Sequence, residues 1–358
     1  MMMSRKIKVW GFVVLLIVVA GLGIFYWNHS SSSTKDDPSK QLVAKTLFKF
    51  DTVINLKLYG DDAAEKHLTK IEQMLDVIDQ QINMSNNNSE IYDVNQAAGK
   101  EAVNVSAETF NLVKVSIDYA QDTKGTFDPS IGPLINLWKI GNGGEHVPDA
   151  DDILREKSLV NYNDIEMDEE HSTIKLAKEG MALDLGGIGK GYAADLVADY
   201  LHQEQIESAI IDLGGSSIIA IGSKPSGESW RIGLQDPDRE RGEQLALIQI
   251  DNQTIDSSGV YERFFMENGV RYHHILDPKT GFPTQNGIKS VTIVGGTATD
   301  ADVLSTALVV MDLEEGMAYV SQKKDVEAMF IMEDNRIYMT PGLKGKISST
   351  NSRYTLVE

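Results

Sequence analysis

An aspartate and a threonine stand four residues apart in the segment TDADVLST, residues 299–306. On a helix, residues at this spacing share a face, so the Asp302 carboxylate and the Thr306 hydroxyl would point the same way. Oxygen ligands of this kind suit Mg²⁺, which keeps positions open for water and phosphate. A structural interpretation stands beside this one, because acidic first turns stabilise helices and threonine can bond to the preceding turn.

A glycine-rich segment, LDLGGIGKGYAAD, covers residues 183–195 and leads from an expected strand into an expected helix. Free amide groups at a helix start suit phosphate. Gly189, Gly191 and Ala194 match the G-x-G-x-x-A dinucleotide pattern, and Asp212 follows at the end of an expected strand. A Rossmann-type oxidoreductase is therefore one alternative, although short strands replace the second crossover helix it needs. A tight turn without a ligand is another.

Two adjacent histidines, His273 and His274, precede the turn sequence Asp-Pro-Lys-Thr-Gly. Catalytic groups concentrate in loops, and an imidazole titrates near neutral pH. Neighbouring residues of a strand point to opposite sides, so at most one of the two is expected to act as a base. A further segment, GTFDP at residues 125–129, offers an aromatic ring and backbone amides but is more often structural.

The elements that must position these residues follow a mixed order. Alternating apolar residues predict a strand over residues 48–58, and apolar residues three and four apart predict a helix over residues 64–82. Another helix is expected over residues 107–120, with Ser106 as its cap. Many short strands follow, without a strict βαβ order. The pattern predicts an α+β fold with antiparallel sheets and packed helices.

Composition excludes several classes of protein. The 358 residues include 33 basic and 53 acidic side chains, a net charge of −20, and no cysteine. Disulfides, thiolate metal sites and cysteine nucleophiles are therefore impossible. Because this charge opposes the phosphate backbone, the sequence predicts no nucleic-acid partner.

The N-terminal region predicts a membrane anchor. Residues 9–27 carry no charge, and a run of this length is long enough for a helix to cross a bilayer. Arg5, Lys6 and Lys8 precede the run. We expect a cytoplasmic basic N-terminus (residues 1–8), a transmembrane signal anchor (9–27), a flexible linker (28–44) and one large extracytoplasmic domain (45–358). A cleaved signal peptide is the competing interpretation.

Six segments, taken together and in order, resemble the ApbE family of FAD:protein FMN transferases over roughly residues 47–340. They are GTFDPSIGPLINLWKIG, LDLGGIGKGYAAD, IIDLGGSS, DSSGVYERF, HHILDPKTGFP and TDADVLSTA. The resemblance implies a single ApbE-like domain related to the T-fold. It also implies an Mg²⁺-dependent enzyme that breaks the FAD pyrophosphate, attaches FMN to a Thr or Ser hydroxyl of an acceptor flavoprotein, and releases AMP.

The resemblance also implies the site residues. Catalytic residues would be Asp302 and His274, with His273 as the fallback for the base. The metal ligands would be Asp302, Thr306, the carbonyl of Gly189 and a backbone oxygen of Ser305. The flavin and its phosphates would be bound by Phe50, Ser85, Thr126, Phe127, Asp128, Gly186, Lys190, Tyr192, Ser258, His274 and Ile275.

The sequence departs from the family pattern in three places. Ser216 and Ser217 replace an asparagine, Phe50-Asp51-Thr52 replaces Met-Gly-Thr, and residues 84–90 lack an aromatic residue that often contacts the flavin ring. Two related functions stay open: Mg²⁺-dependent hydrolysis of FAD to FMN and AMP, and binding of FAD without catalysis. The expected partners are FAD, the membrane and an exported or membrane-bound acceptor.

Overall fold

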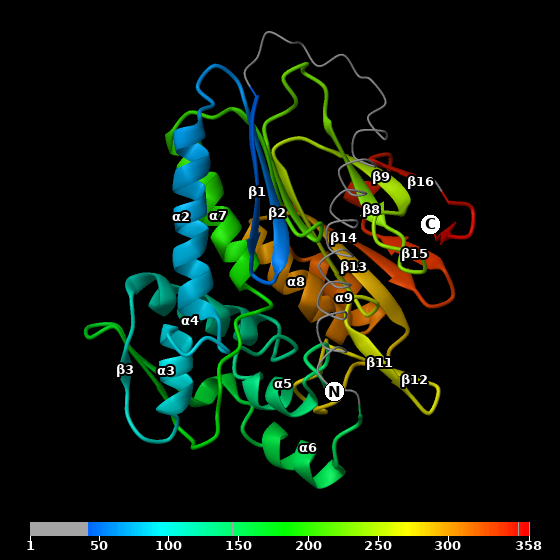
Figure 1. Ribbon diagram of the computed structural model, residues 1–358. Coiled ribbons are helices and arrows are strands. Elements are labelled where there is room, and N and C mark those ends of the chain that lie inside the picture. The colour runs from blue at the N-terminus through cyan, green and yellow to red at the C-terminus, as the bar shows by residue number, and fades with distance from the viewer. Residues whose placement is uncertain (1–41, 145, 350, 358) are drawn as a thin grey trace, which may run out of the picture. The chain divides into compact units, whose positions relative to one another are not determined.

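A nine-stranded sheet forms the centre of the computed structural model, which describes residues 42–144, 146–349 and 351–357 (Figure 1). Neighbouring strands are antiparallel except β15 and β17, which are parallel. In spatial order the strands are β1 (Leu42–Lys49), β2 (Thr52–Tyr59), β6 (Ser208–Leu213), β7 (Ser217–Ile221), β10 (Gln253–Gly259), β13 (Ile288–Gly295), β14 (Val326–Met332), β15 (Arg336–Met339) and β17 (Thr355–Leu356).

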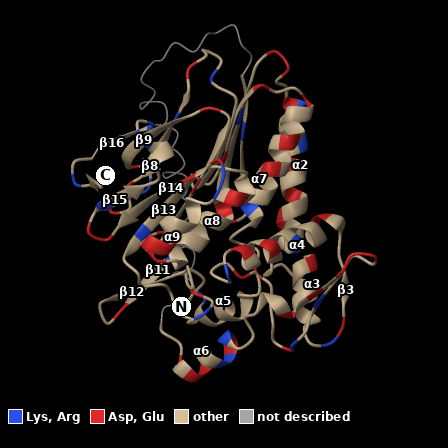
Figure 2. Cartoon of the chain, turned by 180° about the vertical axis from the view of Figure 1, so that it is seen from behind, with Lys and Arg blue, Asp and Glu red and all other residues tan. Residues whose placement is uncertain are grey.

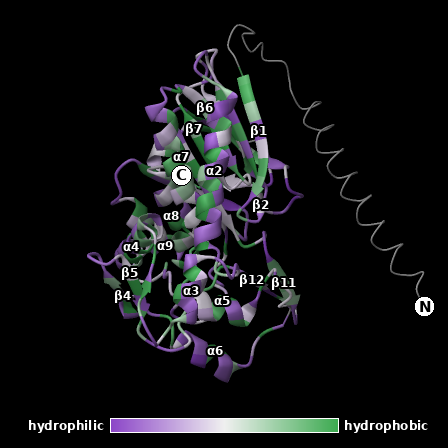
Figure 3. Cartoon of the chain, turned by 60° about the vertical axis from the view of Figure 1, so that its left-hand side comes forward, coloured by the Kyte–Doolittle hydropathy of each residue, from purple (hydrophilic) through white to green (hydrophobic). Residues whose placement is uncertain are grey.

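Helices pack on this sheet, and the main hydrophobic core lies between them and the strands. They are α2 (Glu65–Ile82), α7 (Gly189–Gln203), α8 (Ala298–Val310) and α9 (Leu313–Val320). The buried residues of α2 recur at the predicted spacing, and Figure 3 shows hydrophobic and hydrophilic residues interleaved along this helix. Helix α8 is buried on nearly every side and lies over β7, β10 and β13. The sheet therefore supports α8 directly.

Smaller elements surround the core. A second sheet contains β8 (Trp230–Gln235), β9 (Gln244–Ile250) and β16 (Ile347–Ser349), and a third contains β3 (Val103–Asn104), β4 (Ile165–Asp168) and β5 (Thr173–Leu176). The remaining elements are α3 (Glu90–Gln96), α4 (Ala107–Asp122), α5 (Gly132–Trp138), α6 (Ala150–Lys157), the hairpin β11 (Phe264–Glu267) and β12 (Val270–His273), and two short 3₁₀ turns (Tyr162–Asp164 and Pro341–Leu343). This arrangement confirms the predicted mixture of helices and antiparallel sheets.

Two sequence-based predictions have different outcomes. The helix expected over residues 107–120 is present as α4, and the Ser106 hydroxyl accepts a hydrogen bond from Thr109 N. The strand expected over residues 48–58 is present from Thr52 onward as β2, but its first four residues were wrong, because the chain reverses there between β1 and β2. Phe50 and Asp51 form the two-residue turn with φ of 52° and 55°. Positive φ at both positions matches the twist of the flanking strands, a preference that apolar alternation does not reveal.

No helix within residues 42–144, 146–349 and 351–357 is both long enough and apolar enough to cross a membrane. The predicted anchor at residues 9–27 lies outside the described residues, as does most of the predicted linker. Acidic side chains are spread over many elements, including α2, α4, α6 and α7, as Figure 2 shows.

Candidate active site

The first turn of α8 is held in place by helix α7. The Asp195 carboxylate on α7 accepts hydrogen bonds from Ala298 N at 2.7 Å, Thr299 N at 2.8 Å and the Thr299 hydroxyl at 2.6 Å. Thr297 and Asp300 complete a capping box at the same end. Since a helix start has free N–H groups, these bonds fix where α8 begins relative to α7.

Asp302 lies on α8 and faces the start of α7. Its side chain is only 3% exposed, and its Oδ1 accepts a hydrogen bond from Lys190 Nζ at 2.7 Å. Its Oδ2 accepts one from Gly191 N at 2.9 Å. This amide belongs to the segment that matched the dinucleotide pattern, and in this structure its partner is a carboxylate of the protein itself.

A chain of hydroxyl groups extends from Asp302 to strand β10. The Ser305 hydroxyl lies 3.0 Å from Asp302 O and 2.8 Å from Asp256 Oδ1. The Ser258 hydroxyl lies 2.8 Å from Ser305 Oγ and 3.2 Å from Thr306 Oγ1. The structure thus brings together four predicted site residues and adds Asp256. We call this set the oxygen cluster: Asp256, Ser258, Asp302, Ser305 and Thr306.

Sequence reasoning missed Asp256. It stands two residues before Ser258 on β10, and residues two apart on a strand point to the same face. This alternation is the signal that could have identified it. Asp256 is 1% exposed, and one of its two oxygens already bonds to Ser305.

Burial and the neighbouring Asp302 carboxylate raise the pKa of Asp256 well above its usual range. Burial alone would lower the pKa of Lys190, but the carboxylates of Asp302 and Asp256 outweigh burial and raise it. Lys190 is therefore a stable ammonium ion. The centre of the site holds two carboxylates against the positive charge of Lys190.

The turn before α7 brings Gly187 close to the cluster. A Cβ atom on Gly187 would lie 3.8 Å from Thr306 Oγ1 and 3.4 Å from the Phe127 ring. Gly189, the predicted carbonyl ligand, is instead the first residue of α7, and its Cβ would meet the Ile82 side chain. The strand expected before this turn is reduced to one bridge between Ala182 and Ile131.

The two histidines occupy different environments. His273 is 3% exposed; its Nε2 lies 2.8 Å from Thr284 O, and its Nδ1 accepts a hydrogen bond from Ile275 N at 3.3 Å. These partners assign a neutral imidazole that donates through Nε2. Both ring nitrogens of His273 are thus used in holding the loop, which makes it an unsuitable base.

His274 keeps one ring nitrogen free of partners among the described residues. Its Nδ1 lies 3.3 Å from Arg263 O, so that nitrogen donates and Nε2 is left as the basic one. Burial and the Arg263 guanidinium lower the pKa of His274 to about 3. The imidazole is therefore neutral at physiological pH and able to accept a proton.

Other predicted flavin-binding residues lie around the cluster rather than in it. The Thr126 hydroxyl donates to Thr123 O at 3.1 Å, and the Asp128 carboxylate accepts hydrogen bonds from Ser130 and Tyr162 N. Thr126 holds its own loop, Asp128 joins that loop to the turn at Tyr162, and Phe127 between them lies next to Gly187.

The rest of the predicted set makes no hydrogen bond to the oxygen cluster within the described residues. Phe50 occupies the β1–β2 turn, Ser85 is exposed, Tyr192 is half-buried against the core, and Ile275 is buried in the core. Gly186 N donates to Asp184 Oδ1 at 2.9 Å, and burial raises the pKa of that carboxyl.

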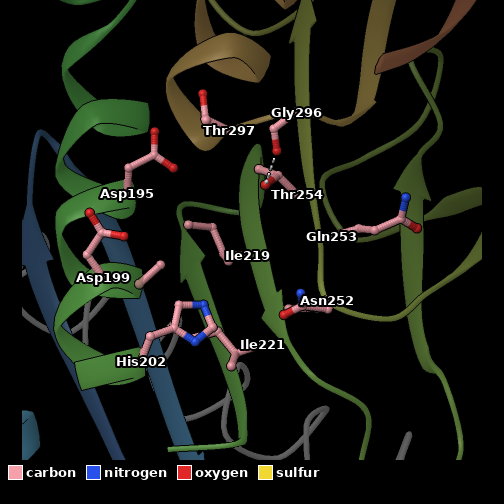
Figure 4. A pocket seen from close by; sticks show the side chains of 12 residues that line it. Asp195, Asp199, His202, Ile219, Ile221, Asn252, Gln253, Thr254, Gly296 and Thr297 are labelled. Carbon is pink, nitrogen blue, oxygen red and sulfur yellow. Dashed lines mark hydrogen bonds between the residues drawn. The ribbon is translucent and has the colours of Figure 1, made fainter. Parts of the chain in front are cut away.

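A separate cavity of about 180 Å³ lies between α7 and strands β7 and β10 (Figure 4). Its lining includes Asp195, Asp199 and His202 from α7 and Thr254 from β10, whose hydroxyl bonds to Gly296 O at 3.4 Å. None of the oxygen cluster lines it, and Asp195 already caps α8. This cavity is therefore distinct from the candidate site.

The donor set of the oxygen cluster suits a hard cation. No group of three or more His, Cys, Asp or Glu in the described part of the chain is arranged to hold a metal ion. The cluster instead offers carboxylates and hydroxyls, with a glycine turn beside them. Mg²⁺ is commonly bound by one or two carboxylates plus substrate phosphates, so these residues fit it.

The fold and cluster define a mixed α/β domain with an oxygen-lined site where helix α8 meets strand β10 and the start of α7. The model of the ApbE family matches residues 50–330, and this chain belongs to that family. A relative from Klebsiella pneumoniae, called FAD:protein FMN transferase, is 35% identical over 305 residues, covering 85% of this chain and 94% of its own. A relative of the same name from Treponema pallidum is 29% identical and covers 99% of both chains.

Solved structures agree with this assignment. The ApbE protein of Thermotoga maritima superposes with a TM-score of 0.78 at 29% identity, covering 86% of this chain and 99% of its own. The flavin transferase ApbE of Vibrio cholerae gives a TM-score of 0.75 at 30% identity, covering 85% and 99%. The residues matched by the family model, 50–330, include every member of the oxygen cluster.

Proposed function

We propose that this protein transfers FMN from FAD to a Thr or Ser hydroxyl of an acceptor flavoprotein and releases AMP. The observation that carries the proposal is the oxygen cluster with Lys190, found in a domain whose relatives are called FAD:protein FMN transferases. The acceptor oxygen forms a bond to the FMN phosphorus, the bond between that phosphorus and the AMP oxygen breaks, and the hydroxyl proton leaves.

We propose Mg²⁺ as the cofactor, held by the Asp302 carboxylate, the Thr306 hydroxyl, a backbone oxygen of Ser305 and a backbone carbonyl of the glycine turn. Gly189 is the carbonyl that the family resemblance implies, and Gly187 is the glycine closest to Thr306. Bound there, the ion would reduce the charge on the pyrophosphate oxygens and stabilise the departing AMP.

Two side chains of this protein would perform the remaining steps. Lys190 supplies a positive charge at the start of α7, where it can bind a phosphate oxygen. His274 would take the hydroxyl proton at Nε2, because Nδ1 donates to Arg263 O. The negative charges of bound FAD would raise the pKa of His274 from its low value and make the imidazole a stronger base.

The test follows acceptor mass and free nucleotides by mass spectrometry. The full-length protein would be incubated with FAD, Mg²⁺ and a purified exported flavoprotein subunit from the same cell. We expect the acceptor to gain the mass of FMN while AMP appears, and both to be lost in Asp302→Ala. Asp199→Ala is the matched control, since Asp199 is exposed on α7 outside the oxygen cluster.

Two other outcomes would replace the proposal. Release of FMN and AMP without any protein adduct would favour hydrolysis, with water in place of the acceptor hydroxyl. Bound FAD that stays unchanged would favour a binding module without catalysis.

We also propose a single-pass membrane protein whose catalytic domain faces away from the cytoplasm. The support is the uncharged run at residues 9–27 preceded by Arg5, Lys6 and Lys8. Its acceptors would then be exported or membrane-bound flavoproteins. External protease added to intact cells should degrade the domain; protection of the domain would contradict this location.

A further inference from the structure

The transfer chemistry described above leaves one buried carboxylate of the oxygen cluster without a task. Asp256 is 1% exposed, and its Oδ2 has no hydrogen-bond partner among the described residues. The hydroxyl of Ser217 lies directly opposite across the β7–β10 pair and interacts with the Asp256 carboxylate. Buried polar atoms are rarely left unpaired, and an exception indicates that something else completes the site.

Asp256 is one hydroxyl group away from the proposed metal ligands. Ser305 Oγ lies 2.8 Å from Asp256 Oδ1, and the same atom lies 2.8 Å from Ser258 Oγ and 3.0 Å from Asp302 O. Ser258 Oγ in turn lies 3.2 Å from Thr306 Oγ1. The unpaired oxygen of Asp256 therefore belongs to the same polar cluster as Asp302 and Thr306.

The charges of this cluster do not balance. Asp256 and Asp302 bring two carboxylates, while Lys190 brings one ammonium group, which contacts Asp302 and acts on Asp256 only through its charge. Burial makes an uncompensated carboxylate costly, so the pair favours an additional cation. The Lys190 ammonium, at 2.7 Å from Asp302 Oδ1, already occupies one position beside Asp302 that a cation would use.

We propose that Asp256 is the second carboxylate of the cation site, and that Lys190 and a divalent cation compete for the Asp256–Asp302 pair. The inference rests on the proposed function only in taking Mg²⁺ as the cation. Cation binding releases Lys190 from Asp302, and the freed ammonium is then available for a phosphate oxygen of FAD. The cation therefore prepares the site for the nucleotide.

The test is calorimetric titration of Mg²⁺ into the full-length protein without FAD. Asp256→Asn keeps an oxygen that can accept from Ser305 but removes the charge, and we expect it to weaken Mg²⁺ binding about tenfold or more. Lys190→Met removes the competitor and should tighten Mg²⁺ binding. Asp236→Asn is the matched control, because Asp236 is an equally buried carboxylate outside the cluster whose oxygens are bonded to Arg353 and Tyr354.

Thermal unfolding without Mg²⁺ distinguishes a cation-binding role of Asp256 from a purely structural role. Removing a buried, unpaired charge should raise the Tm of Asp256→Asn in metal-free buffer while shrinking the further rise that Mg²⁺ gives. A lower Tm, with the Mg²⁺-induced rise unchanged, would overturn the proposal and make Asp256 a support for Ser305 only.

Asp302→Ala serves as the reference variant. If it abolishes Mg²⁺ binding while Asp256→Asn leaves the affinity unchanged, this inference fails and the proposed transferase stands. If Lys190→Met leaves the affinity unchanged or weaker, the competition is refuted. A wild-type protein that binds no Mg²⁺ would overturn both this inference and the proposed cofactor. The transfer of FMN would still be tested separately, by the mass that the acceptor gains.

Discussion

Replacing Gly191 by alanine tests how closely α7 must approach α8 to build the site. A Cβ atom at this position would lie 2.3 Å from Ala298 O, 2.7 Å from Ala298 C and 2.8 Å from Asp302 Cβ. The two closest of these are backbone atoms of α8, which cannot rotate away. The helices would have to separate by about 1 Å to restore normal contacts.

The expected size of the effect follows from two opposing terms. Overpacking costs about 1–3 kcal/mol, while alanine gains about 0.5–1 kcal/mol over glycine in a helix. We therefore expect the free energy of unfolding of Gly191→Ala to fall by about 1–2 kcal/mol. The separation also lengthens the 2.9 Å bond from Gly191 N to Asp302 Oδ2, so transfer should slow by about 100-fold.

Urea unfolding and the rate of acceptor labelling would measure the two effects. Gly189→Ala is the matched control in the same helix, because its Cβ would meet only the Ile82 side chain, whose end can move. We expect its stability to stay within about 1 kcal/mol of the wild type. A Gly191→Ala variant as stable and as active as the wild type would refute the close-packing argument.

Three further predictions concern the scaffold. Burial lowers the pKa of His273 to about 4, so the unfolded chain binds more protons than the folded one between about pH 6.5 and pH 4. The contribution of His273 to the free energy of unfolding should be full above pH 6.5 and decrease as the pH falls through this window. Urea unfolding at pH 7 and pH 5 should therefore show a smaller difference for His273→Asn than for the wild type. Hydrogen bonds from Tyr354 and other groups outweigh burial and lower the pKa of Asp236. The ionised carboxylate therefore stabilises the fold above the unfolded pKa, and this stabilisation is lost as the pH falls below about 4. Asp236→Asn should lower the free energy of unfolding by about 1–3 kcal/mol at pH 7 and by less at pH 3, and equal losses at the two pH values would contradict this. Trp138 donates a hydrogen bond from Nε1 to Gly281 O at 2.9 Å and packs on the hairpin that leads to His274. Trp138→Phe should therefore lower the Tm and slow acceptor labelling. An unchanged labelling rate would show that the position of the hairpin does not affect catalysis.

Local patterns predicted the parts of the fold that local forces determine. The apolar spacing of α2 and the Ser106 cap of α4 were both found as expected, since each depends on residues one or two turns apart. The β1–β2 turn was not predicted, because Phe50 and Asp51 are unusual at positive φ and only the pairing of the two strands imposes it.

The site could be predicted in its main residues but not in its connections. Asp302 and Thr306 share one helix face, so their spacing was sufficient. Asp256 joins them through Ser305 from a strand almost fifty residues earlier in the chain. Its alternation with Ser258 places the two on one face of β10, but no local pattern encodes the contact with Ser305. The difference between His273 and His274 also depends on tertiary partners, Thr284 O for one and Arg263 O for the other.

The central claim is that the FMN half of FAD moves to a protein hydroxyl. The most direct measurement is the ratio of AMP released to FMN attached, determined by quantitative mass spectrometry during one reaction with an acceptor. We expect one AMP for each FMN on the acceptor, little free FMN, and loss of both products in Asp302→Ala. AMP accompanied by an equal amount of free FMN, with the acceptor unmodified, would contradict it.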